Sequence, residues 1–458
     1  MNGTDAAIAV KHLREVPFLN GNTIRGNTMS ASKSSTFDQY ESDVRSYCRM
    51  FPAILEKAKD SYLFDSDGKQ YIDFFCGAGA INYGHNNELI RDSLIEYMQQ
   101  DGIMMSLDFH SQSKERFIVS FQDKVLKPRG LNYKMQFTSP TGTSVVESAV
   151  KLARKHTNRQ NIITFTNAFH GMSGNSLSLT GSKHHRQDVS YGMVTRLPYD
   201  GYLGKDFDYI GYYRKLLQDQ SSGVDLPAAI ILETLQGEGG LNMASPNWLR
   251  GIRELCDEFD IVLIVDDIQA GCGRTGRFFS FERAEIVPDM VCLSKSIGAI
   301  GLPCALLLFK PEMDQWKKGE DNGTFRGNNL AFVAAEKMID LYWTDFEFER
   351  ALEHKSRILT LACQQIHKNF PERISETKGI GFMQGIQFND PNDAKTLIDH
   401  CAQSGLLMES CGPDDQVVKI MPALTIEESV LQEGLSIIDR ESKQCFDNER
   451  YVKEAVFK

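Results

Sequence analysis

Short apolar runs recur along the middle of the chain, and polar or glycine-rich residues follow each of them. Uniformly apolar runs of about five residues predict strands buried on both faces, as in a parallel sheet that helices cover. Four such runs are Ile162–Phe165, Ala228–Leu232, Ile261–Val265 and Asp289–Leu293. Between them apolar residues return at helical spacing, as over residues 248–259. The alternation over residues 85–345 therefore predicts a large α/β domain with a mainly parallel sheet.

The segment before this domain has a different pattern. Apolar residues from Tyr40 to Phe51 return at helical spacing, which predicts a helix over residues 37–57. Two β-rich runs then flank the turn residues Asp65–Gly68, which predicts a hairpin. Residues 1–36 are polar and lack the apolar core of a secretory signal, so we expect a flexible tail.

From Phe346 the chain changes to a long charged helix, short strands and a closing helix over Ile426–Arg440. This mixture predicts a second, smaller α+β domain that also takes in the segment before the large domain. The expected organisation is a tail (1–36), two parts of the small domain (37–84 and 346–458) and the large domain (85–345).

Composition narrows the classes of function. The chain has 458 residues, of which 41% are hydrophobic and 24% charged, as in ordinary globular proteins. Its formal net charge of −11 argues against nucleic-acid binding, and no apolar run approaches the roughly 18 residues of a membrane span. The 10 cysteines form no C-x-x-C pair, which argues against a zinc cluster or a disulfide framework. We expect a cytoplasmic protein without a bound metal.

Charged residues follow two of the apolar runs. Asp266 and Asp267 end one run, and Ser294 and Lys295 end the next. Ligands of open α/β sheets bind where the carboxyl ends of the strands emerge. We therefore expect an acid and a lysine to face one ligand, and our hypothesis is that Lys295 carries pyridoxal phosphate (PLP) while Asp266 binds its ring nitrogen.

Other loops carry weaker signals. Small hydroxyl residues around Gly142 begin a helix, where they are either a simple cap or a phosphate site. Phe169 follows a strand and either packs in the core or stacks on a planar ring. Glu233 and Glu238 lie in a glycine-rich loop that suggests a site, and the glycine-rich segment 76–86 is either a tight connection or a substrate-facing loop.

An acid pair after a buried strand also occurs in P-loop ATPases, where it holds magnesium. That machinery requires an upstream phosphate loop with the pattern G-x-x-x-x-G-K-[ST], and this chain has none. A nucleotide-hydrolysing enzyme is therefore the weaker interpretation.

Six motifs occur together and in order: T-G-T-x-x-x-E, F-H-G, E-T-x-Q-G-E-G-G, D-D-I-Q-x-G-x-G-R-T-G, S-K and T-F-R-G-N. This series resembles the class III (ω-) aminotransferases, which are PLP enzymes of fold type I, and the resemblance spans about residues 37–440. The stretches A-F-H-G-M-S, L-P-Y-D-G-Y and N-G-T-F-R-G-N-N are most similar to the branch that transfers an amino group between L-2,4-diaminobutyrate and 2-oxoglutarate, as in ectoine biosynthesis.

The resemblance implies roles for matching positions. Lys295 would bind PLP covalently and move the proton between substrate and cofactor, and Asp266 would keep the ring nitrogen protonated. Gln269 would bond the ring oxygen, and Phe169 would stack on the ring. The phosphate would rest on backbone N–H groups at the helix start. The cofactor-binding residues would be Thr141, Gly142, Thr143, Phe169, His170, Asp266, Gln269, Lys295 and Thr324.

Thr324 would reach the phosphate of a partner subunit, which implies a homodimer or a larger homo-oligomer. Substrates would contact Glu233, Glu238 and Lys419. Glu238 matches the family's movable gate. Lys419 stands where many relatives have an arginine that binds the carboxylate of 2-oxoglutarate, and lysine supplies charge without the planar two-point grip of guanidinium.

The implied reaction is ping-pong transamination between amino-acid and keto-acid substrates. L-Glutamate would donate its amino group, and L-aspartate 4-semialdehyde would receive it to give L-2,4-diaminobutyrate. The alternatives are another ω-aminotransferase, of the 4-aminobutyrate or ornithine type, and a glutamate-semialdehyde-type aminomutase.

Overall fold

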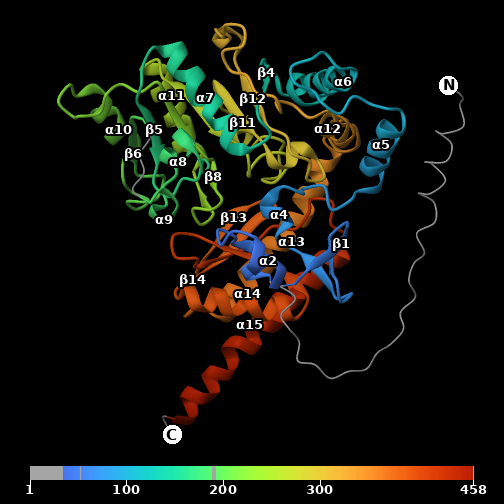
Figure 1. Ribbon diagram of the computed structural model, residues 1–458. Coiled ribbons are helices and arrows are strands. Elements are labelled where there is room, and N and C mark those ends of the chain that lie inside the picture. Colours follow the sequence, from blue (N-terminus) through green and yellow to red (C-terminus); the bar gives the residue numbers. More distant parts are fainter. Residues whose placement is uncertain (1–34, 52, 188–191, 457–458) are drawn as a thin grey trace, which may run out of the picture. The chain divides into compact units, whose positions relative to one another are not determined.

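A computed structural model describes residues 35–51, 53–187 and 192–456 (Figure 1). The chain divides into two units after residue 54, and residues 55–458 form the second, compact unit. Almost all of the predicted tail, residues 1–34, lies outside the described residues. Among the described residues, no helix combines the length and apolar character needed to cross a membrane.

The helix predicted for residues 37–57 is wrong. The first unit holds two short helices, α2 (Ser35–Tyr40) and α3 (Tyr47–Met50), and residues 55–59 already belong to strand β1 of the second unit. A helix gains most of its stability by burying an apolar face. Here Tyr40 and Val44 stay 78% and 88% exposed, so no packing supports a continuous helix through the polar residues between them.

The main sheet confirms the predicted parallel core. Its seven strands have the order β4-β12-β11-β10-β7-β5-β6. All neighbours pair in parallel except β12, which runs antiparallel to both β11 and β4. The strands are β4 (Lys134–Phe137), β5 (Ile162–Phe165), β6 (Val194–Leu197), β7 (Ala229–Leu232), β10 (Val262–Asp266), β11 (Met290–Leu293) and β12 (Leu306–Phe309).

Helices cover both faces of this sheet (Figure 1). Alternate residues of β10 belong to two separate apolar clusters: Ile264 packs with α7, and Leu263 packs with α11 on the other face. Uniformly apolar strands are thus explained by burial on two sides. The helices of this region are α5 (Glu88–Gln99), α6 (Gln112–Ser120), α7 (Gly142–Thr157), α8 (Gly174–Leu179), α9 (Lys183–Arg186), α10 (Tyr209–Gln218), α11 (Pro246–Glu258) and α12 (Asn329–Tyr342).

The remaining strands form small sheets. The predicted hairpin is present, with β2 (Tyr62–Asp65) antiparallel to β3 (Gln70–Asp73). Strand β15 (Leu406–Leu407) then pairs with β3, so distant parts of the sequence share one sheet of order β1-β2-β3-β15. Residues 55–458 form one compact unit, so the domain boundaries at residues 84 and 345 stay predictions.

A second small sheet has the order β13-β14-β17-β16 and lies with three long helices. Its strands are β13 (Ile374–Ile380), β14 (Met383–Phe388), β16 (Glu409–Cys411) and β17 (Val417–Ile420). The helices are α13 (Glu347–Asn369), α14 (Pro391–Gln403) and α15 (Glu428–Val456). The closing helix is therefore longer than the predicted Ile426–Arg440.

Candidate active site

Two neighbouring strand ends bring the predicted acid and lysine to one edge of the sheet. Strands β10 and β11 pair in parallel, with Asp266 opposite Cys292, and Lys295 begins the short helical turn that follows β11. Asp266 is 4% exposed and Lys295 is half-buried. Lys295 also has a φ of +49°, a left-handed conformation that a lysine adopts only at a cost. The backbone is thus held in an unfavourable geometry at the residue expected to react.

Asp266 is paired with a buried histidine. Its Oδ2 lies 2.7 Å from Nδ1 of His170, and its Oδ1 accepts the N–H of Ile268 at 3.2 Å. Burial by itself lowers the pKa of His170, but the hydrogen bond and charge of Asp266 more than offset this, so the pKa is raised. Nε2 of His170 has no hydrogen-bond partner among the described residues.

The adjacent acid, Asp267, has a different environment. Its side chain is 0% exposed and accepts the N–H of Ser280 at 3.1 Å. Burial raises the pKa of Asp267 to about 7. The two acids are adjacent in sequence, but their side chains have different partners, and only Asp266 is paired with a histidine.

The glycine-rich segment 76–86 lies against the lysine. Nζ of Lys295 donates to the carbonyl of Ala78 at 2.8 Å. Cys76, Gly77, Ala78 and Gly79, which form α4 (Cys76–Gly79), all have positive φ values, between 54° and 82°. Left-handed geometry costs a residue with a side chain roughly 1–2 kcal/mol. The segment is therefore a strained turn that presents its carbonyl to the site.

Burial lowers the pKa of Lys295, and the nearby charge of Lys419 acts in the same direction while Glu238 opposes it. A lysine with a lowered pKa is more often neutral, which an amine needs in order to attack a carbonyl group. The position thus suits a nucleophilic lysine.

A chain of polar contacts leads from this lysine to strand β17. The carbonyl of Ala78 also accepts Nε2 of Gln269 at 2.9 Å, and the same amide donates to Oε1 of Glu238 at 3.1 Å. Nζ of Lys419 lies 2.9 Å from Oε1 of Glu238. Burial alone would raise the pKa of Glu238, but Lys419 and Lys295 lower it to about 2. Glu238 is therefore held as a carboxylate, with Lys419 as its direct cationic partner.

The start of helix α7 lies beside the Asp266 loop. Thr141 caps the helix by accepting the N–H of Ser144 at 3.2 Å, and the N–H groups of Gly142 and Thr143 have no partner among the described residues. A side chain at Gly142 would come within 3.2 Å of Ile268. Free N–H groups at a helix start attract anions. The backbone thus offers a phosphate-sized anion two donors next to Asp266.

Phe169 and Glu233 lie in the loops that follow strands β5 and β7. The ring of Phe169 is half-buried and meets the ring of His185 edge-on at 5.7 Å. Its N–H donates to Glu233 at 3.0 Å, and Glu233 also accepts the N–H of Gly237 at 3.3 Å. Burial raises the pKa of Glu233 to about 7, and the positive charge of His170 opposes the rise. Glu233 thus ties two loops together in this conformation.

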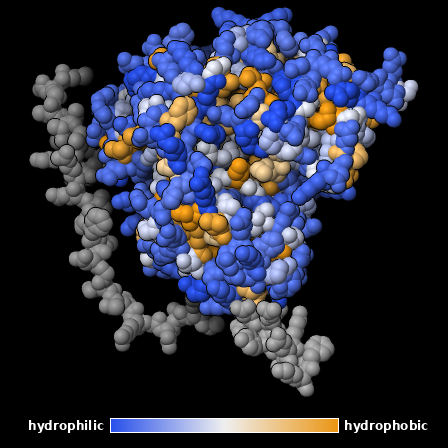
Figure 2. Space-filling model, turned by 180° about the vertical axis from the view of Figure 1, so that it is seen from behind, coloured by the Kyte–Doolittle hydropathy of each residue, from blue (hydrophilic) through white to orange (hydrophobic). Residues whose placement is uncertain are grey.

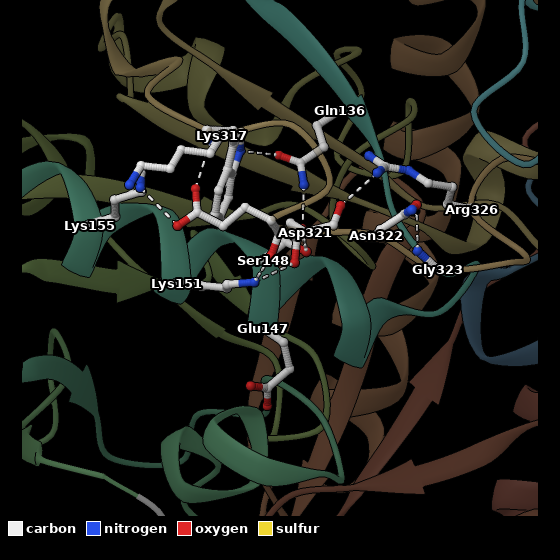
Figure 3. A network of polar contacts seen from close by, with 12 residues as sticks. Gln136, Glu147, Ser148, Lys151, Lys155, Lys317, Asp321, Asn322, Gly323 and Arg326 are labelled. Atoms are coloured by element: carbon white, nitrogen blue, oxygen red, sulfur yellow. Dashed lines mark hydrogen bonds and ion pairs between the residues drawn. The ribbon is translucent and has the colours of Figure 1, made fainter.

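Within the described part of the chain, the structure shows no hydrogen bond between Thr324 and the other predicted residues. Thr324 is exposed in the loop before α12. Asp321 anchors this loop to α7: its Oδ2 accepts Nε2 of Gln136 at 2.5 Å and the hydroxyl of Ser148 at 2.7 Å (Figure 3). The carbonyl of Asp321 accepts Arg326 at 2.6 Å. The loop is therefore fastened to the first half of the helix whose start holds the free N–H groups.

Sequence reasoning missed Glu409. It lies opposite Lys419 in the β16–β17 pairing, and its Oε1 is 2.7 Å from Nζ. Burial raises the pKa of Glu409 to about 7, with Lys419 opposing the rise. An isolated acid in the apolar stretch L-L-M-E-S-C was the available signal, but its partner depends on a strand register that the sequence does not show.

Comparisons with known proteins identify a family and relatives of the chain. The family model for class-III aminotransferases matches residues 44–441. The chain is 51% identical over 406 residues to a diaminobutyrate–2-oxoglutarate transaminase of Vibrio cholerae, covering 88% of this chain and 98% of the relative. It is 48% identical over 428 residues to the enzyme of that name from Halalkalibacterium halodurans, covering 93% and 100%.

Solved structures share the fold. An ornithine aminotransferase from Toxoplasma gondii superposes with a TM-score of 0.78 at 20% identity, covering 98% of this chain and 100% of that one. A transaminase from the marine bacterium Virgibacillus gives 0.79 at 20% identity, covering 89% and 97%. These likenesses confirm the predicted fold.

Proposed function

Because the chain belongs to the class-III aminotransferases, a family of PLP-dependent enzymes, we propose that it transfers an amino group from L-glutamate to L-aspartate 4-semialdehyde, giving L-2,4-diaminobutyrate and 2-oxoglutarate. The observation that carries the proposal is the meeting of Lys295 and Asp266 at adjacent ends of parallel strands, with Lys419 and Glu238 connected to them. The names of relatives that are about half identical to the chain support the choice of substrates.

The donor set fits PLP. The N–H groups of Gly142 and Thr143 would hold its phosphate, Asp266 would accept from its ring nitrogen, and Lys295 would bind its aldehyde carbon. The unpartnered Nε2 of His170 marks a polar group beside Asp266 that still lacks a contact. When bound, PLP accepts the amino group from one substrate, passes it to the next, and spreads into its ring the electrons left at the substrate carbon.

The chain's own groups account for proton movement. Lys295, whose pKa is lowered by burial, is placed to take a proton from the substrate carbon and return it. Asp266 supplies a negative charge that His170 orients at 2.7 Å. The carbonyl of Ala78 holds the lysine ammonium when that amine is free.

The two substrates make opposite demands on the same site. Glutamate reacts through its α-amine, so a carboxylate lies next to the reacting carbon. Diaminobutyrate reacts through its distal amine, which is attached to a methylene. A cation near Lys295 must therefore be available to the first substrate and neutralised for the second. Lys419 paired with a movable Glu238 meets both requirements. Its charge is neutralised while Glu238 stays beside it, and it becomes available to a substrate carboxylate when Glu238 moves away.

A homodimer in the cytoplasm is part of the proposal. Exposed apolar side chains gather on α5 and the segment that follows it, namely Leu89, Ile95, Met98, Ile103, Met104 and Met105. Figure 2 shows that one face of the molecule carries separate apolar patches within a mostly hydrophilic surface. Large apolar patches are typical of protein interfaces. Thr324 would then serve the partner's phosphate site, and the product would feed ectoine synthesis or a related pathway.

Purified protein supplied with PLP tests the reaction. Incubation of diaminobutyrate with 2-oxoglutarate should yield glutamate, and absence of exchange would reject the proposal. Faster exchange with 4-aminobutyrate or ornithine would instead indicate another ω-aminotransferase. Turnover of one substrate without 2-oxoglutarate would indicate an aminomutase.

A further inference from the structure

Lys419 has a second carboxylate partner besides Glu238. The antiparallel pairing of β16 with β17 sets Glu409 directly opposite Lys419, with 2.7 Å between Oε1 and Nζ. The side chains of Lys419 and Glu409 are 0% and 3% exposed, whereas that of Glu238 is 31% exposed. Glu238 is therefore the member of the triad that reaches solvent, and Glu409 is fixed in the interior.

Glu238, the exposed member of the triad, also makes contacts that a substrate carboxylate could make in its place. Glu238 lies in the loop between β8 (Leu235–Gln236) and β9 (Asn242–Met243), and its Oε1 is shared by Gln269 and Lys419. Glu409 belongs to a strand whose backbone pairs with β17. A substrate carboxylate can take the place of Glu238 beside the lysine, whereas the buried side chain of Glu409 starts from a strand position directly opposite Lys419.

The exchange of Glu238 for a substrate carboxylate has a costly intermediate stage. Once Glu238 leaves and before the substrate arrives, a fully buried ammonium would have no carboxylate if Glu409 were absent. An unpaired buried charge is strongly unfavourable. Because Glu409 remains 2.7 Å away, Lys419 keeps a carboxylate partner throughout.

We infer that Glu409 is a positioning residue for the glutamate half-reaction: as the fixed counter-ion of Lys419, it allows Glu238 to leave so that the α-carboxylate of glutamate can replace it. This inference rests on the proposed function. In the diaminobutyrate half-reaction the reacting carbon is a methylene that carries no carboxylate, so Glu238 stays on Lys419 and Glu409 is not needed. Glu409 acts through Lys419 and does not itself contact the substrate.

Single-turnover measurements on the PLP-loaded full chain test the inference. Glu409→Gln is mixed separately with glutamate and with diaminobutyrate, and conversion of the cofactor from its aldehyde to its amine form is followed by absorbance. The rate constant with glutamate should fall at least about tenfold, because an unpaired buried charge now forms during the exchange. The rate constant with diaminobutyrate should stay within about twofold. Any loss of folded protein cancels in the ratio of the two.

Two further variants separate a charge effect from a packing effect. Glu409→Asp keeps the charge and should retain more of the glutamate rate than Glu409→Gln. Glu441→Gln removes another buried carboxylate, one that accepts the hydroxyl of Ser404 at 2.8 Å, and should leave the ratio unchanged. An unchanged ratio in Glu409→Gln overturns the inference and leaves the proposed function standing. A wild-type chain that does not react with diaminobutyrate overturns both.

Discussion

Replacing Glu409 by glutamine should also change how the stability of the protein depends on pH. Glu409 is 3% exposed, and burial raises its pKa from the ordinary 4.5 to about 7 although Lys419 opposes the rise. Lys419 has one charge and two carboxylate neighbours, and Glu238 already neutralises it. The negative charge of Glu409 is therefore in excess whenever both acids are ionised.

The sign and size of the effect follow from proton linkage. A carboxyl whose pKa is higher in the folded state binds its proton more tightly there, so its contribution to stability is complete below pH 4.5 and is lost as the pH rises to about 7. The difference of about 2.5 pH units corresponds to about 3 kcal/mol at about 1.4 kcal/mol per unit. Glutamine cannot ionise, so Glu409→Gln should match the wild type near pH 4.5 and exceed its unfolding free energy by up to about 3 kcal/mol at pH 8.

Urea unfolding of both proteins at pH 4.5 and pH 8 measures this difference. Both samples need the same saturating PLP concentration, because a ligand that binds the folded state shifts apparent stability. The quantity to compare is the change between the two pH values, in which any packing cost of the amide cancels. A variant that loses stability relative to the wild type on going from pH 4.5 to pH 8 would refute the reasoning, since it would show that the charge of Glu409 stabilises the triad.

Three further substitutions have expected outcomes. Lys295→Ala should abolish turnover and the bond to PLP that borohydride reduction traps, and a trapped bond in this variant would contradict the assignment. Asp266→Asn should lower kcat at least about a hundredfold, as loss of one preorganised charge does, and should lower the pKa of His170 in NMR titration; an unchanged pKa would show that another group holds the histidine. Arg274→Lys should reduce the unfolding free energy by roughly 3 kcal/mol or more in urea, because Arg274 is 0% exposed and donates to Asn82 and to the carbonyls of Phe382 and Pro422, and each buried acceptor left unsatisfied costs about 1–3 kcal/mol. A loss below about 0.5 kcal/mol would mean that the lysine recovers those contacts.

The main sheet could be predicted because burial on both faces leaves a clear signal in the sequence. Val262, Leu263, Ile264 and Val265 are all apolar since two helical layers cover β10. The direction of a strand leaves no such signal, so the antiparallel course of β12 was not predicted. The helix expected over residues 37–57 failed for the opposite reason: its apolar spacing is real, but Tyr40 and Val44 bury nothing.

The candidate site also has one part that the sequence predicts and another part that it does not. Asp266 and Lys295 could be placed together because each ends an apolar run and parallel strands end at one edge. The contact of Gln269 with Ala78 joins residues far apart in sequence, which no local pattern encodes. The contact of Glu409 with Lys419 joins two neighbouring strands, and it depends on a register that the sequence does not show.

The triad also shows what a lysine at position 419 provides that an arginine would not. Residues directly opposite in an antiparallel pair have Cβ atoms about 5 Å apart, which leaves Glu409 close to Lys419. An ammonium is compact, so Nζ can donate a hydrogen bond to Glu238 at 2.9 Å while it forms an ion pair with Glu409 at 2.7 Å. A planar guanidinium directs its donors in a fixed fork, which suits one carboxylate held at two points. A site built on arginine thus grips a single carboxylate firmly, whereas Lys419 shares its charge between a permanent carboxylate and a replaceable one. That division suits an enzyme that must bind a carboxylate beside the reacting carbon in one half-reaction and release it in the other.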